Sequence, residues 1–120
     1  MPTASSLSRP QIFTVIIPAY NEEKYLPATL AAARRALLEL RHEERVITEL
    51  IVVDNHSTDR TAEIARESSA KVVYEEYNQI ARARNTGARQ AAGDFLTFID
   101  ADTLVNPELV LNTWKAMARD

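Results

Sequence analysis

Short apolar runs alternate along the chain with longer stretches of helical periodicity. Four runs rich in Ile, Val and Phe cover residues 12–17, 49–53, 71–74 and 95–99, and their length and composition are typical of β-strands. Parallel neighbouring strands need a long connection, and a helix supplies it. The alternation therefore predicts an α/β fold with a Rossmann-like parallel sheet, right-handed crossovers and flanking helices.

The segments between the runs predict four helices. One apolar face recurs at intervals of four and three residues in Leu26, Leu30, Ala33, Leu37 and Leu40. A second helix is expected to begin near residues 57–59, where hydroxyl and carboxylate side chains can cap it. A third spans about 78–92, and Pro107 stands at the first position of a fourth.

The third predicted helix has two different faces. The small side chains Ala83, Gly87 and Ala91, together with Ile80, form a stripe suited to close packing, while Asn78, Arg82 and Asn85 lie on another face. Residues two positions apart on a helix cannot share a face, so only one of Arg82 and Arg84 is expected to approach a ligand. A guanidinium suits phosphate oxygens, and the alternative is a pair of solvent-facing arginines.

Polar residues gather where the predicted strands end. Open α/β sheets bind ligands at the carboxyl ends of their strands. Those ends are residues 18–22, 54–55, 75–76 and 100–102. Nearly all the residues whose side chains could bind a ligand or a metal ion therefore fall on one edge of the sheet.

Asp100 and Asp102 follow the last strand directly. In extended backbone, residues two apart point the same way, so both carboxylates can converge on one partner. Mg²⁺ and Mn²⁺ typically take one or two protein carboxylates and fill their other positions with water and phosphate oxygens. The alternative is an acidic loop in which Asp102 or Asn106 caps the next helix.

Asp54 ends the second strand and invites two interpretations. Its carboxylate can accept a hydrogen bond from an imide N–H or a ribose hydroxyl, or it can close an Asx-turn into the following helix. His56 lies in the same loop. It has no second histidine or carboxylate at ligand spacing, so a solvated loop histidine is the favoured interpretation.

The bulk composition indicates one globular domain. The chain has 120 residues, of which 46% are hydrophobic and 26% charged. The net charge of −3 and the dispersed basic residues give no general reason to expect nucleic acid or an anionic membrane as partner. No apolar run approaches the roughly 20 residues of a membrane span. We expect a flexible leader over residues 1–10 and the folded domain over 11–120.

Absent residue types narrow the chemistry further. The chain has no cysteine, which removes disulfides and thiol nucleophiles and fits a reducing compartment, so a cytoplasmic location is expected. With only Gly87 and Gly93 it has no glycine-rich phosphate loop, and no Ser-His-Asp nucleophile elbow is visible. Phosphate must then be held by a metal ion and side chains.

Three stretches taken together carry a family resemblance. The segments FTVIIPAYNEEKYLPATL, ELIVVDNHSTDRTAEIA and NQIARARNTGARQAAGDFLTFIDADT resemble, in order and spacing, the nucleotide-sugar-binding half of the family 2 glycosyltransferases. That family has the GT-A fold. The resemblance covers about residues 13–109.

The resemblance implies a nucleotide-binding role for eight residues and a metal-binding role for two. The first group is Pro18, Ala19, Asn21 and Glu22 around the base and ribose, Asp54 reading the base, Arg82 and Asn85 beside the nucleotide, and Asp100 at the ribose or metal region. The second is the DxD pair, in which Asp102, with Asp100, ligates Mn²⁺ or Mg²⁺ on the diphosphate. One departure is His56, which stands where the family often has glycine.

The function implied is metal-dependent transfer of a sugar from a nucleotide-diphosphate sugar to an unknown acceptor. A UDP-sugar is favoured by its frequency in the family. The resemblance also implies that the acceptor-binding half and the usual catalytic base lie beyond residue 120, because the sequence shows no positioned base. Without that half, an uncovered strand edge and apolar surface are expected to cause self-association.

Three other classes are possible explanations of the same pattern. A phosphoacceptor receiver domain has a similar length, but its first strand should end in acids, whereas here it ends in Pro18-Ala19-Tyr20. A nucleotidyltransferase would carry a glycine-rich loop near the first strand, which is absent. A non-catalytic nucleotide-binding or scaffold protein of the same fold remains an alternative.

Overall fold

The computed structural model describes residues 9–118, which form a parallel sheet covered by helices on both faces. The elements are β1 (Gln11–Ala19), α2 (Leu26–Glu43), β2 (Val46–Asp54), α3 (Thr61–Glu67), β3 (Lys71–Tyr74), α4 (Ile80–Gln90), β4 (Phe95–Phe98) and α5 (Pro107–Ala118). The four strands are parallel in the order β3-β2-β1-β4. The predicted α/β class is confirmed.

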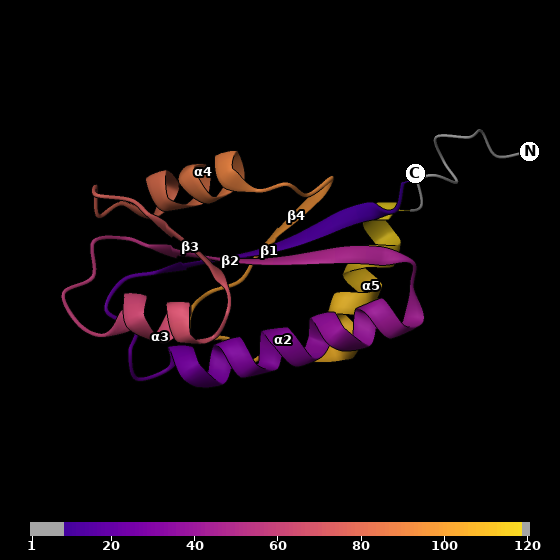
Figure 1. The fold of residues 1–120 in the computed structure, drawn as a ribbon, viewed down its shortest axis with the longest axis horizontal. Coiled ribbons are helices and arrows are strands. Elements are labelled where there is room, and N and C mark those ends of the chain that lie inside the picture. The colour runs from indigo at the N-terminus through magenta and orange to yellow at the C-terminus, as the bar shows by residue number, and fades with distance from the viewer. Residues whose placement is uncertain (1–8, 119–120) are drawn as a thin grey trace, which may run out of the picture.

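The helices divide unequally between the two faces of the sheet (Figure 1). Phe13, Val15 and Ile17 of β1 point into the larger core, where α2 and α5 pack. In this core the rings of Phe13 and Trp114 meet edge-on, with their centroids 6.0 Å apart. Ile16, one position out of phase, points to the other face and packs with Ala83 of α4. This alternation follows from the two-residue period of a strand.

Close packing of α4 depends on a glycine. A Cβ on Gly87 would lie 2.6 Å from Cγ2 of Ile16 and 2.9 Å from Cγ2 of Val53. The helix therefore reaches the sheet only because that position lacks a side chain. Ile80, predicted for the same packing stripe, is instead 56% exposed, because it stands at the first turn of α4, beyond the sheet.

The observed boundaries differ from the predicted ones mainly at strand and helix ends. β1 and β2 run longer than their apolar cores, since pairing from Gln11↔Val46 to Ala19↔Asp54 continues through polar positions. α3 begins at Thr61 rather than near residues 57–59, because that segment forms a hydrogen-bonded loop. α5 begins at Pro107 as predicted.

The amino-terminal end of the described chain is attached to the sheet. Residues 1–8 of the predicted leader lie outside the described residues. Arg9, the next residue, forms an ion pair of 3.0 Å with Asp94, whose other carboxylate oxygen accepts from the backbone N–H of Ile12 at 2.8 Å. Across residues 9–118, no helix combines the length and apolar character needed to cross a membrane.

Candidate functional site

A pocket opens at the carboxyl edge of the sheet. Its volume is about 380 Å³, and it is lined by Pro18, Ala19, Tyr20, Glu22, Asn55, Asn78, Ile80, Asp100, Ala101 and Asp102. These residues come from the ends of β1, β2 and β4 and from the start of α4. The ends of these strands, which were expected to meet at one edge of the sheet, therefore line one common pocket.

The loops after β1 and β2 are bonded to each other across the pocket rim. The backbone N–H of Asn21 donates to Ser57 Oγ at 3.0 Å, and Asn21 Oδ1 accepts from the N–H of Thr58 at 2.7 Å. The N–H of Glu22 donates to Thr61 Oγ1 at 2.9 Å. Asn21 has φ of 50°, in the left-handed region that asparagine tolerates. Its side chain therefore holds the two loops together.

Asp54 and Asn55 are buried at the end of β2, with exposed fractions of 6% and 4%. Asp54 Oδ1 accepts from the N–H of Ser57 at 3.0 Å. This bond from a backbone N–H is of the kind expected in the Asx-turn interpretation of Asp54. The Asn55 amide donates to the carbonyl oxygens of Glu75 at 3.2 Å and Tyr77 at 2.5 Å. Asn55 thus attaches the segment after β3 to the pocket.

The DxD segment is held by its middle residue. Ala101 is buried, and its carbonyl oxygen accepts from Thr29 Oγ1 of α2 at 2.6 Å. Asp100 and Asp102 are exposed on either side of it, and neither carboxylate makes a hydrogen bond within residues 9–118. The cap of α5 is Asn106, whose Oδ1 accepts from the N–H of Leu109 at 2.7 Å.

The charges around the pocket are mostly negative. Burial raises the pKa of Glu22, and the neighbouring carboxylates Asp102 and Asp59 raise it further. Burial also acts to raise the pKa of Asp59, but hydrogen bonds from the side chain and backbone of Thr61 and from the Glu23 N–H outweigh it, so this pKa is lowered. A cation near Asp102 would relieve the repulsion on Glu22.

Asp100 and Asp102 could supply only part of the ligand shell of a divalent ion. In the described part of the chain no group of three or more His, Cys, Asp or Glu side chains could hold a metal by itself. Two exposed acids without internal partners fit an ion that draws its remaining ligands from diphosphate and water. Asp100 and Asp102 therefore suit Mg²⁺ or Mn²⁺ only together with a bound diphosphate.

The two arginines of α4 occupy different surroundings. The Arg82 guanidinium lies 4.3 Å from the centroid of the Tyr77 ring, and its Nε donates to Gln79 Oε1 at 3.2 Å. Arg84 lies over Phe98, 5.8 Å from the ring centroid, and lines a second cavity of about 330 Å³ that Asp100 also borders. Arg82 and the exposed Asn85 do not line the first pocket.

His56 adopts a conformation that favours glycine. Its φ is 64°, and its Nδ1 hydrogen-bonds the hydroxyl of Tyr74. This left-handed backbone explains why a glycine suits the position in the resembling family. The loop keeps its turn with a histidine, whose ring centroid lies 6.0 Å from that of Tyr74.

Several lining residues received no binding role from the sequence. They are Tyr20, Asn55, Asn78 and Ile80 at the first pocket and Arg84 at the second. Tyr20 and Asn55 are immediate neighbours of predicted residues at strand ends, so their position was a usable signal. The arrangement as a whole defines a GT-A-type α/β domain with an acidic pocket at its carboxyl edge.

The chain belongs to glycosyltransferase family 2. The model of that family, described as Glycosyl transferase family 2, matches residues 14–120. A relative, 4,4'-diaponeurosporenoate glycosyltransferase of Staphylococcus haemolyticus, is 41% identical over 108 residues, covering 84% of this chain and 27% of the relative.

Solved structures of two other glycosyltransferases match the fold. Staphylococcus aureus TarS in complex with UDP superposes with a TM-score of 0.72 and 31% identity, over 89% of this chain and 32% of that one. Mycobacterium tuberculosis glucosyl-3-phosphoglycerate synthase, in complex with Mn²⁺, UDP and glucosyl-3-phosphoglycerate, has a TM-score of 0.68 and 26% identity, over 91% and 39%. The chain thus spans 27% of the length of the first relative, and 32% and 39% of the chains in these two solved structures.

Proposed function

We propose that residues 11–120 form the nucleotide-sugar-binding domain of a metal-dependent glycosyltransferase that uses a UDP-sugar. The observation that carries this proposal is the convergence of the β1 end, Asn55, the start of α4 and the DxD segment on one pocket. The UDP and Mn²⁺ in the structures of the relatives support the choice of nucleotide and ion.

Each predicted site residue receives a role in this proposal. Pro18, Ala19 and Glu22 would border the base and ribose, and Asn21 would hold their loop in place. Asp54 has one oxygen bonded to the Ser57 N–H, which leaves its second oxygen for an imide N–H. Arg82 and Asn85 are assigned to the outer side of the nucleotide, and Arg84 is added because it shares a cavity with Asp100.

Asp100 and Asp102 would hold the divalent ion together with the donor diphosphate. When bound, such an ion neutralises charge that grows on the departing nucleoside diphosphate. The protein's contribution is to keep both carboxylates exposed and aligned, through the Thr29 bond to the Ala101 carbonyl. We assign no catalytic base and no acceptor contact to residues 11–120, because deprotonating an acceptor hydroxyl needs a base within hydrogen-bond reach.

Calorimetric titration with UDP and GDP, with and without Mn²⁺, tests the proposal. We expect metal-dependent binding that is tighter for UDP than for GDP. Failure of both nucleotides to bind would overturn it. Release of pyrophosphate from UTP and a sugar 1-phosphate would instead identify a nucleotidyltransferase, and nucleotide binding without turnover in the full-length protein would identify a non-catalytic relative.

We also propose a cytoplasmic location and self-association of the 120-residue chain. The cysteine-free composition supports a reducing compartment. β4 is an edge strand whose last residue, Phe98, is 41% exposed, and Leu104 and Leu109, which follow it in the chain, are 66% and 54% exposed. Light scattering should therefore detect dimers or larger species as concentration rises, and a monomer at every concentration would contradict the association.

A further inference from the structure

The outer face of α2 carries cations and small or apolar side chains in one exposed stripe. Its members are Lys24, which stands just before the helix, and the exposed residues Ala28, Ala31, Arg34, Arg35, Leu38 and Arg41 of the helix. The acids of the helix, Glu39 and Glu43, lie on the neighbouring flank, where they line a different groove with Glu108 of α5. Glu39 borders the stripe, because it stands four residues after Arg35 on the helix.

A groove runs beside this stripe, between α2 and α3. Its volume is about 540 Å³, and its lining is mainly apolar, from Pro27, Leu30, Ala31, Leu38 and Ile64. Leu38 is 50% exposed at its rim. Arg34 and Arg35 stand on the α2 side, and Glu67 and Ser68 on the α3 side. Apolar side chains flanked by arginines are typical of surfaces that lie in a membrane interface.

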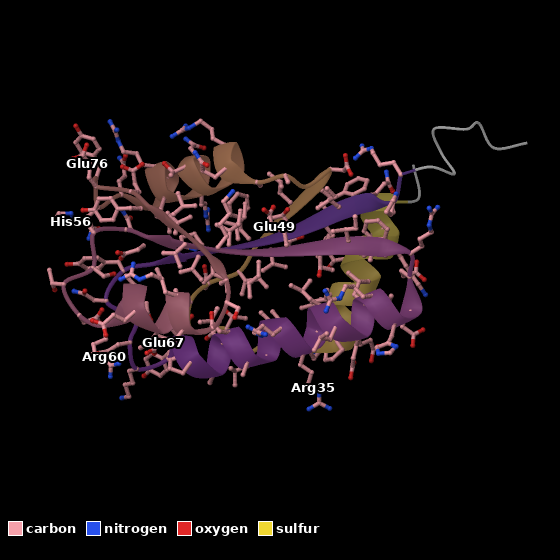
Figure 2. All side chains as sticks on the ribbon, in the orientation of Figure 1. Arg35, Glu49, His56, Arg60, Glu67 and Glu76 are labelled. Atoms are coloured by element: carbon pink, nitrogen blue, oxygen red, sulfur yellow. The ribbon has the colours of Figure 1, made fainter. Side chains whose placement is uncertain are left out.

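The stripe is free to meet a flat surface. In Figure 1, α2 runs along the lower side of the molecule. Arg35 projects away from the body of the protein in Figure 2. The 18 residues of α2 make a contact line of about 27 Å. The net charge of −3 thus conceals a concentrated positive surface.

We propose that this stripe docks the protein on the surface of a bilayer that contains anionic phospholipid. Each Lys or Arg near such a surface strengthens partition by about fivefold, and Leu38 with the groove offers apolar contact below the headgroups. Two acids oppose the attraction: Glu67 faces the stripe across the groove, and Glu39 lies 3.8 Å from Arg35 in an exposed ion pair.

Docking would also orient the donor pocket. α2 begins at the carboxyl edge of the sheet, so Lys24 and the half-exposed Tyr25 bring that edge next to the bilayer. The docking surface does not depend on the proposed activity, because none of its cations lines the pocket.

Co-sedimentation with vesicles tests the proposal. We expect the protein to bind vesicles of mixed phosphatidylglycerol and phosphatidylcholine, and to release them as salt screens the charges. Vesicles of phosphatidylcholine alone should not bind. Equal binding to both kinds of vesicle, or binding to neither, would overturn the proposal, and binding to polyglutamate without vesicle binding would make the stripe a protein-docking surface instead.

Variants assign the effect to the stripe. Replacing Arg34, Arg35 and Arg41 together by Gln should weaken partition by about 100-fold, while Lys115→Gln on α5 should leave it unchanged. Glu67→Gln should strengthen it severalfold, which a loss of folding cannot imitate. Wild-type partition of the triple variant, or no gain in Glu67→Gln, would overturn the proposal. UDP affinity should not change in any of them.

Discussion

The two sides of the candidate donor pocket are built differently. On one side, the loops after β1 and β2 are joined by hydrogen bonds through Asn21, Ser57 and Thr58. On the other side, the loop after β4 presents Asp100 and Asp102, whose carboxylates make no hydrogen bond in the described part of the chain. The polar groups named on the first side have partners within the protein, whereas the two carboxylates on the second side are available to bind a ligand.

This difference separates stability from binding. Hydrogen bonds between the first two loops are part of the folded state, so their loss should lower the free energy of unfolding. The DxD carboxylates add negative charge to the pocket, where burial and the carboxylates of Asp102 and Asp59 raise the pKa of Glu22. Their loss should leave the fold intact and remove affinity for a cation. Substitutions at four positions probe this separation.

The largest effect is expected from Asp102→Asn. It should weaken Mn²⁺-dependent UDP binding by about 100-fold, because an amide cannot replace a carboxylate ligand. The free energy of unfolding should change by less than about 0.5 kcal/mol, since the side chain has no internal partner. Calorimetry and urea unfolding measure the two quantities. Glu63→Gln on α3 is the control. Wild-type affinity in Asp102→Asn would show that residues 100–102 form a loop that does not bind the metal ion.

Asn21→Ala should act in the opposite way. It removes the bond to the Thr58 N–H and places alanine at a φ of 50°, so urea unfolding should show a loss of about 2 kcal/mol. Asn21→Gly loses the same bond but tolerates the conformation, and should cost about 1 kcal/mol less. Equal losses in both variants would show that the backbone conformation carries no strain.

A smaller effect is expected at His56. Because its φ is 64°, His56→Gly should be more stable than His56→Ala by about 1 kcal/mol. Both variants lose the contact with the Tyr74 hydroxyl, so the comparison isolates the backbone. Thermal unfolding of the pair measures it, and a more stable alanine variant would refute the explanation.

The smallest effect concerns pH. The pKa of Glu22 is raised in the fold from its ordinary 4.5, so the folded state binds more protons than the unfolded state above that value, and stability falls as pH rises through this window. Asp59 has a lowered pKa, and its contribution is lost instead as pH falls below its ordinary 3.8. Glu22→Gln should flatten the decline above pH 4.5 in unfolding curves, and an unchanged slope would exclude Glu22 as its source.

Much of the fold was predictable because strands and helices carry local periodicity. The strand β3 was predicted at its observed bounds, and β4 to within one residue. The start of α3 was predicted too early. Thr58 bonds to Asn21 in the loop after β1, and the helix begins only at Thr61, whose N–H donates to Asp59 Oδ1. Ile80 was predicted as packed, but periodicity cannot tell how far a helix extends past its sheet.

The sequence by itself determined the α/β class and the edge of the sheet at which polar residues gather. These follow from local chain geometry. Only the tertiary structure decided that Asn55 attaches the segment after β3, that Arg84 rather than Arg82 shares a cavity with Asp100, and that Thr29 holds the Ala101 carbonyl. Such contacts join segments far apart in the chain, and the packing of the helices against the sheet sets their distances.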